Sequence, residues 1–260
     1  MKKVEAFGMM IDHVTLDEAL SELIAFAKKK KKGYVVTPNT DHVIKFHKNP
    51  EFRKAYGGAA FTFADGAPVV AVSKLAGNPL PERVTGVDIF LRILPMLEEN
   101  KLSLFLLGPS EEVNKAGADK IALRHPKMKI KGRYAPLFGF EKNPAELDKM
   151  FKIVKKAKPD FLFIFLSCPK QELWISQNIQ KLDLKVAICL GASLEFYTSH
   201  RKRAPRIFQL VGMEWVWRMF SEPKRLIKRY LVDDMFPFLW LAFKEIVSKR
   251  FGRKKQAAAQ

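Results

Sequence analysis

The stretch DFLFIFLS, residues Asp160–Ser167, decides the fold class. Its six middle residues are all apolar, whereas a strand with one face in water alternates apolar and polar side chains. A continuous apolar run of this length is typical of a strand that is buried on both faces. Such strands belong to parallel sheets with helices packed on each side, so the stretch predicts an α/β protein.

Further strand patterns recur along the chain and alternate with helix patterns. The other predicted strands are Tyr34–Asn39, Phe61–Asp65, Leu102–Gly108, Lys127–Tyr134 and Lys185–Gly191. Thr15 and Glu18 form a capping box at the start of one predicted helix, and Asn143 and Pro144 start another that runs to about Lys158. We therefore predict a doubly wound, mostly parallel, Rossmann-like α/β catalytic domain over residues 1–204.

The pattern changes near Pro205. Residues 205–250 predict a helical, basic, membrane-associating appendage, and residues 251–260 predict a disordered tail. The whole chain has 46 Lys and Arg against 27 Asp and Glu, a formal net charge of +19, and residues 200–255 hold 15 of the former against 5 of the latter. A surface this basic favours polyanions, namely nucleic acid, anionic lipid or phosphorylated substrates.

The composition of the chain indicates in which cellular compartment we expect the protein. The two cysteines, Cys168 and Cys189, both lie in apolar segments of a 260-residue chain, which suits a reducing cytosol better than a disulfide framework. The N-terminus lacks the apolar region of a secretory signal. The longest late apolar run, Met235–Phe243, is far shorter than the roughly 20 residues that span a bilayer. We expect a protein that is soluble or lies on a membrane surface.

An acidic residue, Asp65, interrupts the apolar stretch FTFADGAPVV (Phe61–Val70) between a predicted strand and a predicted helix. In open α/β sheets the carboxyl ends of the strands form the edge where ligands bind, so this position suits a functional carboxylate. Asp is also a common helix cap, and a cap of the following helix is the simpler interpretation. The ten residues leave both interpretations open.

Other polar residues follow the predicted strands in the same way. Thr37 and Asn39 come at the end of the first predicted strand. Residues 167–171, which include Gln171, follow the strand in DFLFIFLS. Residues 191–193 follow the last predicted strand. Arg83 lies in the loop region after Asp65. Each has a simpler interpretation, such as an Asx turn for Asn39, a surface ion pair for Arg83 and a helix start with Pro169 at its first position for residues 167–171. Because a parallel sheet brings these ends to one edge, we expect them to converge.

Several common ligand-binding patterns are missing from the sequence. It has no G-x-G-x-x-G dinucleotide fingerprint, no phosphate-binding P-loop and no D-x-D, and none of its five histidines has a partner at metal-ligand spacing. We therefore expect no cofactor and no metal ion. A bound diphosphate would have to be neutralised by cationic side chains and helix N-termini.

Five segments together resemble a known family. The segments TPNTDHV, ADGAPVV, ERVTGVD, PKQELWI and RAPRIFQLVGMEWVWRMFSEPKRLIKRYL resemble, in this order, the WecG/TagA/CpsF family of bacterial glycosyltransferases. The resemblance runs from about Val4 to Val247 and is nearest to the TagA branch. It implies Asp65 as the catalytic residue and Thr37, Asn39, Arg83 and Gln171 as substrate-binding residues.

The resemblance also implies a reaction. The TagA branch transfers N-acetylmannosamine from a UDP donor onto undecaprenyl-diphosphate-linked N-acetylglucosamine, in a β-1,4 linkage, for the linkage unit of wall teichoic acid. This implies a peripheral bacterial protein at the cytoplasmic face of the cell membrane, whose UDP-sugar is a substrate and not a cofactor. An α-linked donor that gives a β-product requires inversion, for which Asp65 would serve as general base.

Cations for the leaving diphosphate are predicted in the appendage. On a helix from Met213 onward, Arg218 and Arg225 share one face with Lys228 beside it, and apolar residues occupy the opposite face. The later segment 229–255 is aromatic and basic, which favours an anionic membrane surface as partner. The alternative is an ordinary pair of C-terminal helices folded onto the core.

Other possibilities stay open at this point. N-acetylmannosamine uronic acid and glucose are alternative donor sugars, and the oligomeric state, including a homo-oligomer, is not determined. A nucleic-acid-binding protein would explain the charge, but we find no motif for it and expect no nucleic-acid partner. An oxidoreductase would suit the fold but lacks the glycine fingerprint.

Overall fold

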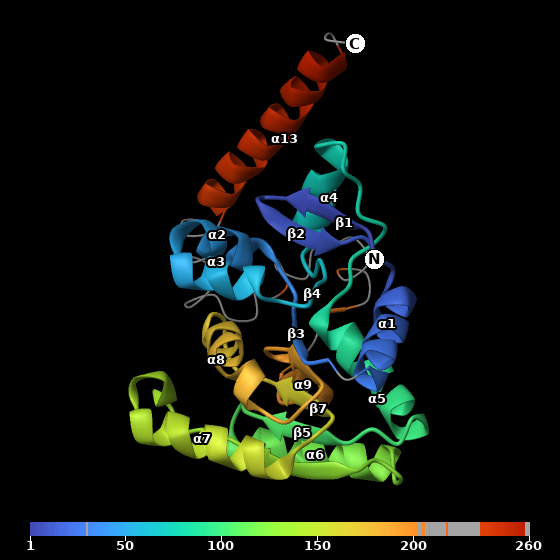
Figure 1. The fold of residues 1–260 in the computed structure, drawn as a ribbon, viewed down its shortest axis with the longest axis vertical. Coiled ribbons are helices and arrows are strands. Elements are labelled where there is room, and N and C mark those ends of the chain that lie inside the picture. The colour runs from blue at the N-terminus through green and yellow to red at the C-terminus, as the bar shows by residue number, and fades with distance from the viewer. Residues whose placement is uncertain (30, 202–203, 206–207, 209–216, 218–234, 258–260) are drawn as a thin grey trace.

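A six-stranded, all-parallel sheet forms the centre of the molecule in a computed structural model, with helices on both faces (Figure 1). The structure describes residues 1–29, 31–201, 204–205, 208, 217 and 235–257. The strand order is β4-β3-β8-β7-β5-β6. The strands are β3 (Gly33–Val36), β4 (Phe61–Thr62), β5 (Leu104–Leu107), β6 (Ile130–Tyr134), β7 (Phe161–Ile164) and β8 (Val186–Cys189). The predicted α/β class is confirmed.

The continuous apolar strands serve two cores at once, because successive side chains point to opposite faces. Leu162 and Ile164 of β7 enter one core, and Phe161 and Phe163 enter the other. Helices that supply the first core are α2 (Thr40–Lys48), α3 (Pro50–Gly57), α4 (Ala67–Leu75), α7 (Pro144–Ala157) and α8 (Lys170–Asn178). Helices that supply the second are α1 (Leu16–Lys28), α5 (Gly86–Glu99), α6 (Glu111–Arg124) and α9 (Ser193–Tyr197). Two short 3-10 turns, η1 (Phe140–Lys142) and η2 (Ile179–Lys181), complete the connections.

Two predicted helix starts are confirmed in atomic detail. Thr15 and Glu18 make a reciprocal capping box at the start of α1. Asn143 caps α7 by accepting hydrogen bonds from the next two free backbone N–H groups, and Pro144 takes the first helical position. These local signals fix where the helices begin, and the apolar stripes then decide which core each helix covers.

The N-terminal residues form an antiparallel hairpin of β1 (Lys3–Ala6) and β2 (Met9–Asp12), which the sequence patterns did not predict. Its turn places Phe7 and Gly8 at positive φ. The buried carboxylate of Asp12 accepts a hydrogen bond from the backbone N–H of Thr62 at 2.8 Å. The hairpin therefore covers the outer edge of β4 and satisfies a backbone group that an edge strand would leave open.

A long C-terminal helix, α13 (Phe236–Ala257), packs on the hairpin side of the molecule (Figure 1). Its buried Phe238 stacks near Phe7 with ring centroids 5.4 Å apart, and Lys249 forms a 3.0 Å ion pair with Glu5. The predicted boundary between appendage and tail, at residue 250, lies inside this helix. Within the part of the chain that the structure describes, no helix is long and apolar enough to cross a membrane.

Asn114 of α6 generates a stability prediction. Its side-chain nitrogen is fully buried and donates to the carbonyl oxygens of Leu106, Gly108 and Tyr134, which joins α6 to β5 and β6. Replacing Asn114 by Ala leaves these carbonyls without their donor, so Asn114→Ala should lower the free energy of unfolding by about 2 kcal/mol.

Urea unfolding measures this change. The neighbouring Lys115→Ala is the control: its ion pair with Asp119 is exposed, so the change should stay within about 0.5 kcal/mol. Equal stabilities of the two variants would contradict the role given to Asn114.

Candidate functional site

The loops that follow β3 and β4 are bonded to each other at the carboxyl edge of the sheet. The backbone N–H groups of Asp65 and Gly66 both donate to the carbonyl of Pro38, at 3.0 and 3.2 Å. A Cβ on Gly66 would lie only 3.0 Å from the Cα of Asn39, so a glycine lets the two loops approach this closely. The structure thus brings Asp65 beside Thr37 and Asn39.

Asp65 does not cap the helix that follows it. The N-cap of α4 is Gly66, which has no side chain with which to cap the helix start. The carboxylate of Asp65 instead accepts a 3.4 Å hydrogen bond from the N–H of Gly86, the first residue of α5. The interpretation of Asp65 as a cap of the next helix is therefore wrong, and the half-buried carboxylate stands between two helix starts.

The loop before α5 brings Arg83 to the same region. The N–H of Val84 donates to the carbonyl of Ala64 at 2.8 Å, next to Asp65, and Arg83 is half-buried. A Cβ on Gly86 would lie 3.7 Å from the carbonyl oxygen of Leu190. The start of α5 is therefore in contact with the loop after β8, and four loops meet at this edge.

Gln171 ties the β8 loop to α8. Its side-chain oxygen accepts a 3.1 Å hydrogen bond from the N–H of Gly191, and its side-chain nitrogen donates to Glu172 at 2.7 Å. Gln171 and Glu172 are both buried. Sequence reasoning selected Gln171 but missed Glu172, although an acidic residue among the core-facing positions of PKQELWI is a usable signal.

Thr37 and Asn39 have different surroundings. Thr37 is buried at the end of β3, whereas Asn39 is half-buried and caps α2 by accepting a 3.2 Å hydrogen bond from the N–H of His42. The simpler interpretation of Asn39, a local turn or cap, therefore holds for its side-chain oxygen. A role of either residue in binding sugar hydroxyls stays a prediction.

Helix starts give this edge a positive electrostatic character. The helices α2, α4, α5 and α8 all begin at the carboxyl ends of the strands, and each helix N-terminus carries a partial positive charge. Asn39 and Thr85 cap α2 and α5, but α4 and α8 have no side-chain cap. The first backbone N–H groups of α8, those of Lys170 and Gln171, donate instead to the carbonyl of Ser167.

A partly buried cluster of polar side chains lies at the start of α2. Asp41, His42 and Cys168 place their ligand-type atoms within 4.8 Å of one another. The sequence could not show this group, because Cys168 comes from a distant loop. Lys45 already forms an ion pair with Asp41, and the ring Nδ1 of His42 lies 2.6 Å from the hydroxyl of Tyr56.

Burial determines the protonation state of the Cys168 thiol in this group. Burial raises the pKa of the Cys168 thiol far above its usual range, and the nearby Glu172 raises it further. A neutral thiol is a poor metal ligand, since the thiolate is the form that binds. The expectation that no metal is needed stays a prediction.

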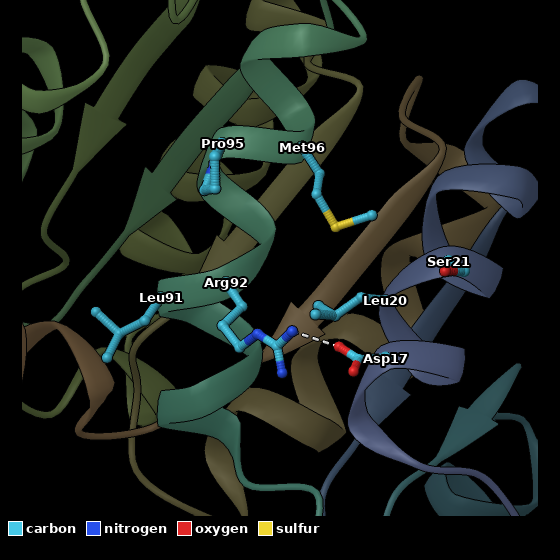
Figure 2. Close-up of a pocket in the computed structure, with 7 residues that line it drawn as sticks. All are labelled: Asp17, Leu20, Ser21, Leu91, Arg92, Pro95 and Met96. Carbon is cyan, nitrogen blue, oxygen red and sulfur yellow. Dashed lines mark hydrogen bonds and ion pairs between the residues drawn. The ribbon is translucent and has the colours of Figure 1, made fainter.

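A cavity of about 490 Å³ lies elsewhere, between α1 and α5. Figure 2 shows Arg92 of α5 reaching across it to form an ion pair with Asp17 of α1. Leu20 and Met96 supply apolar lining. Its lining includes neither Asp65 nor Gln171, and its charged groups already neutralise each other, so we do not assign the chemistry to it. The predicted diphosphate ligands Arg218, Arg225 and Lys228 lie outside the described residues.

Comparison with known proteins now places the chain. Residues 4–252 match the model of the glycosyl transferase WecG/TagA/CpsF family. The chain belongs to this family, and it is a glycosyltransferase. Relatives from Staphylococcus aureus strains MRSA252 and MW2 bear the name N-acetylglucosaminyldiphosphoundecaprenol N-acetyl-beta-D-mannosaminyltransferase. Each is 27% identical over 226 residues, which cover 86% of this chain and 87% of the relative.

The group of Asp41, His42 and Cys168 gives a test of metal dependence. We expect sugar transfer to survive excess EDTA, because Lys45 already supplies the positive charge beside Asp41 and the sequence has no D-x-D pattern. Cys168→Ala should respond in the same way as the unchanged protein. Loss of transfer on chelation, with recovery on adding zinc or magnesium to the unchanged protein but not to Cys168→Ala, would contradict this expectation.

Proposed function

We propose that this glycosyltransferase moves N-acetylmannosamine from UDP-N-acetylmannosamine to the N-acetylglucosamine of an undecaprenyl-diphosphate-linked acceptor. The names of the Staphylococcus aureus relatives support the sugar and the acceptor. The product would be the β-1,4-linked disaccharide that begins the linkage unit of wall teichoic acid. UDP-N-acetylmannosamine uronic acid and UDP-glucose are the alternative donors.

The position of the Asp65 carboxylate is the observation that carries the proposal. It is held between the starts of α4 and α5, half-exposed, where the loops of β3 and β4 meet. In the proposed reaction it accepts the proton of the attacking acceptor hydroxyl. The hydroxyl oxygen then bonds to the anomeric carbon as the bond to UDP breaks, which inverts the configuration in one displacement.

The leaving diphosphate needs positive charge. The N-termini of α4 and α8 place the positive ends of their helix dipoles at the same edge. Arg83 lies in the adjoining loop, and Arg218, Arg225 and Lys228 are the proposed cations from the appendage. Together these groups would stabilise the charge that develops on UDP without a metal ion.

An exposed apolar stripe on α13 supports a location at the membrane surface. Phe236, Leu239, Trp240 and Phe243 follow helical spacing and are all exposed, Trp240 by 67%, while Phe238 and Ala242 pack on the core. Lys244, Lys249 and Arg250 lie on the same helix, although Lys249 also pairs with Glu5 and Arg250 donates to the carbonyl of Leu75. An apolar stripe with nearby cations suits the interface of an anionic bilayer, where the lipid-linked acceptor resides.

A nucleic-acid-binding protein is the remaining candidate of another class. It would account for the net charge of +19, but the family match covers nearly the whole chain and names a glycosyltransferase. No further observation favours nucleic acid as partner.

Asp65→Asn tests the proposed base. The amide keeps the shape of the side chain and can still accept a hydrogen bond from Gly86, so folding and binding of UDP should be nearly unchanged. Without a base, turnover should fall by about two orders of magnitude or more. Release of UDP in steady-state assays and a thermal unfolding curve measure both properties. Near-normal turnover would place the base elsewhere.

Leu239→Glu tests the membrane surface. Leu239 is 55% exposed on the apolar stripe of α13, so a carboxylate there should strongly reduce sedimentation with anionic vesicles, without lowering thermal stability. Leu123→Glu is the matched control, because Leu123 is 83% exposed on α6, outside α13. Equal loss of sedimentation in both variants, or in neither, would contradict the assignment to α13.

A further inference from the structure

Glu172 is a fully buried acidic residue at the base of the candidate site. It has 0% exposed surface, and Oε1 accepts the hydrogen bond from the side-chain nitrogen of Gln171 at 2.7 Å. Oε2 is buried and has no hydrogen-bond partner among the residues that the structure describes. A carboxyl group kept in this condition is costly, so its retention next to a site residue needs an explanation.

The surroundings of Glu172 come from several elements. The charged and titratable groups near it are Lys45 and Asp41 of α2, Tyr56 of α3, Cys168 in the loop before α8, and Cys189 of β8. Burial raises the pKa of Glu172 to about 7, Asp41 acts in the same direction, and Lys45 opposes them. Both protonation states of this carboxyl are therefore accessible near neutral pH.

The hydrogen bonds of Gln171 depend on that protonation state. An ionised carboxylate only accepts hydrogen bonds, so it requires the nitrogen end of the Gln171 amide to face Glu172. The oxygen end then faces Gly191 and accepts its N–H at 3.1 Å. A protonated carboxyl can also donate, and it would equally accommodate the reversed amide, which sets two donors against each other at Gly191.

We propose that Glu172 is a positioning residue: its carboxylate orients the Gln171 amide, which holds the Gly191 turn and so sets the shape of the donor-binding edge. The proposal rests on the proposed function, in which this edge binds the UDP-sugar. Gly191 adopts a positive φ of 52° at the end of β8, and this loop also contacts the start of α5 beside Asp65. A reorientation of the Gln171 amide would therefore shift the Gly191 loop and, through the start of α5, the position of the Asp65 carboxylate.

Two variants separate positioning from simple stability. Glu172→Gln keeps an oxygen that accepts from Gln171 but cannot ionise near pH 7, and Glu172→Met removes the acceptor while keeping similar bulk. Glu146→Gln is the matched control, because Glu146 is also buried, bonding to Tyr134 and Leu137, but has no contact with Gln171. Thermal unfolding of each variant identifies any that fails to fold.

The pH profile of kcat/KM for the donor is the first measurement. In the unchanged protein and in Glu146→Gln, kcat/KM should be about tenfold lower at pH 6 than at its plateau, as expected for an ionised group with a pKa near 7. Glu172→Gln should lose this dependence, and Glu172→Met should be at least about tenfold slower at every pH. An unchanged acid limb in Glu172→Gln, or full activity in folded Glu172→Met, would overturn the proposal.

The pH dependence of stability is the second measurement, and stability should change with pH in the opposite direction to activity. Because the pKa in the folded state exceeds the usual value of 4.5, the stabilisation from protonated Glu172 is complete below about pH 4.5 and is lost as the pH rises through about 7. The stability of the unchanged protein relative to Glu172→Gln should therefore fall over the range in which its activity rises. If the carboxyl had only a structural role, the pH dependence of stability and that of kcat/KM would not change over the same pH range.

A third reading does not depend on transferase activity. In protein labelled with 15N, the side-chain NH₂ signals of Gln171 should shift with a midpoint near pH 7 in the unchanged protein and stay constant in Glu172→Gln. If no UDP-sugar is transferred, the proposed function fails while this titration still decides whether Glu172 controls Gln171. Gln171 signals that do not respond to pH would overturn the positioning role.

Discussion

Two backbone hydrogen bonds to the carbonyl of Pro38 set the position of the acidic group on which the candidate site is built. They come from the N–H groups of Asp65 and Gly66 and join the loops after β3 and β4. The parallel register, with Val36 beside Thr62, brings those loops to the same height. Because the backbone of Asp65 is fixed by its hydrogen bond to Pro38, the position of its side chain is fixed as well. The carboxylate then accepts a hydrogen bond from the N–H of Gly86 in α5.

The same edge has the electrostatic character that the proposed UDP-sugar substrate needs. Parallel strands end together, and the helices that follow them begin together, so partial positive charges collect where the acidic side chain stands. In the proposed reaction Asp65 would accept a proton, and the positive ends of α4 and α8 would favour the phosphate charge. The buried pair of Gln171 and Glu172 connects this surface to the core.

Sequence patterns predicted the strands well because the physical signal is strong. A strand buried on both faces must be apolar throughout, and DFLFIFLS meets that requirement without ambiguity. The N-terminal hairpin escaped prediction because each strand has only four residues, and alternation over such a length is weak. The proximity of Asp41 and His42 to Cys168 arises from tertiary packing alone, which no spacing rule in the sequence expresses.

We propose that this glycosyltransferase adds one sugar, with inversion, to a lipid-linked acceptor. The most direct measurement is mass spectrometry and NMR of the product formed from a panel of UDP-sugars and undecaprenyl-diphosphate-linked N-acetylglucosamine. The account predicts one added N-acetylhexosamine from UDP-N-acetylmannosamine, in a β-1,4 linkage. A product formed only from another UDP-sugar would show that N-acetylmannosamine is not the donor sugar. An α-linked product would contradict the single displacement in which Asp65 acts as base.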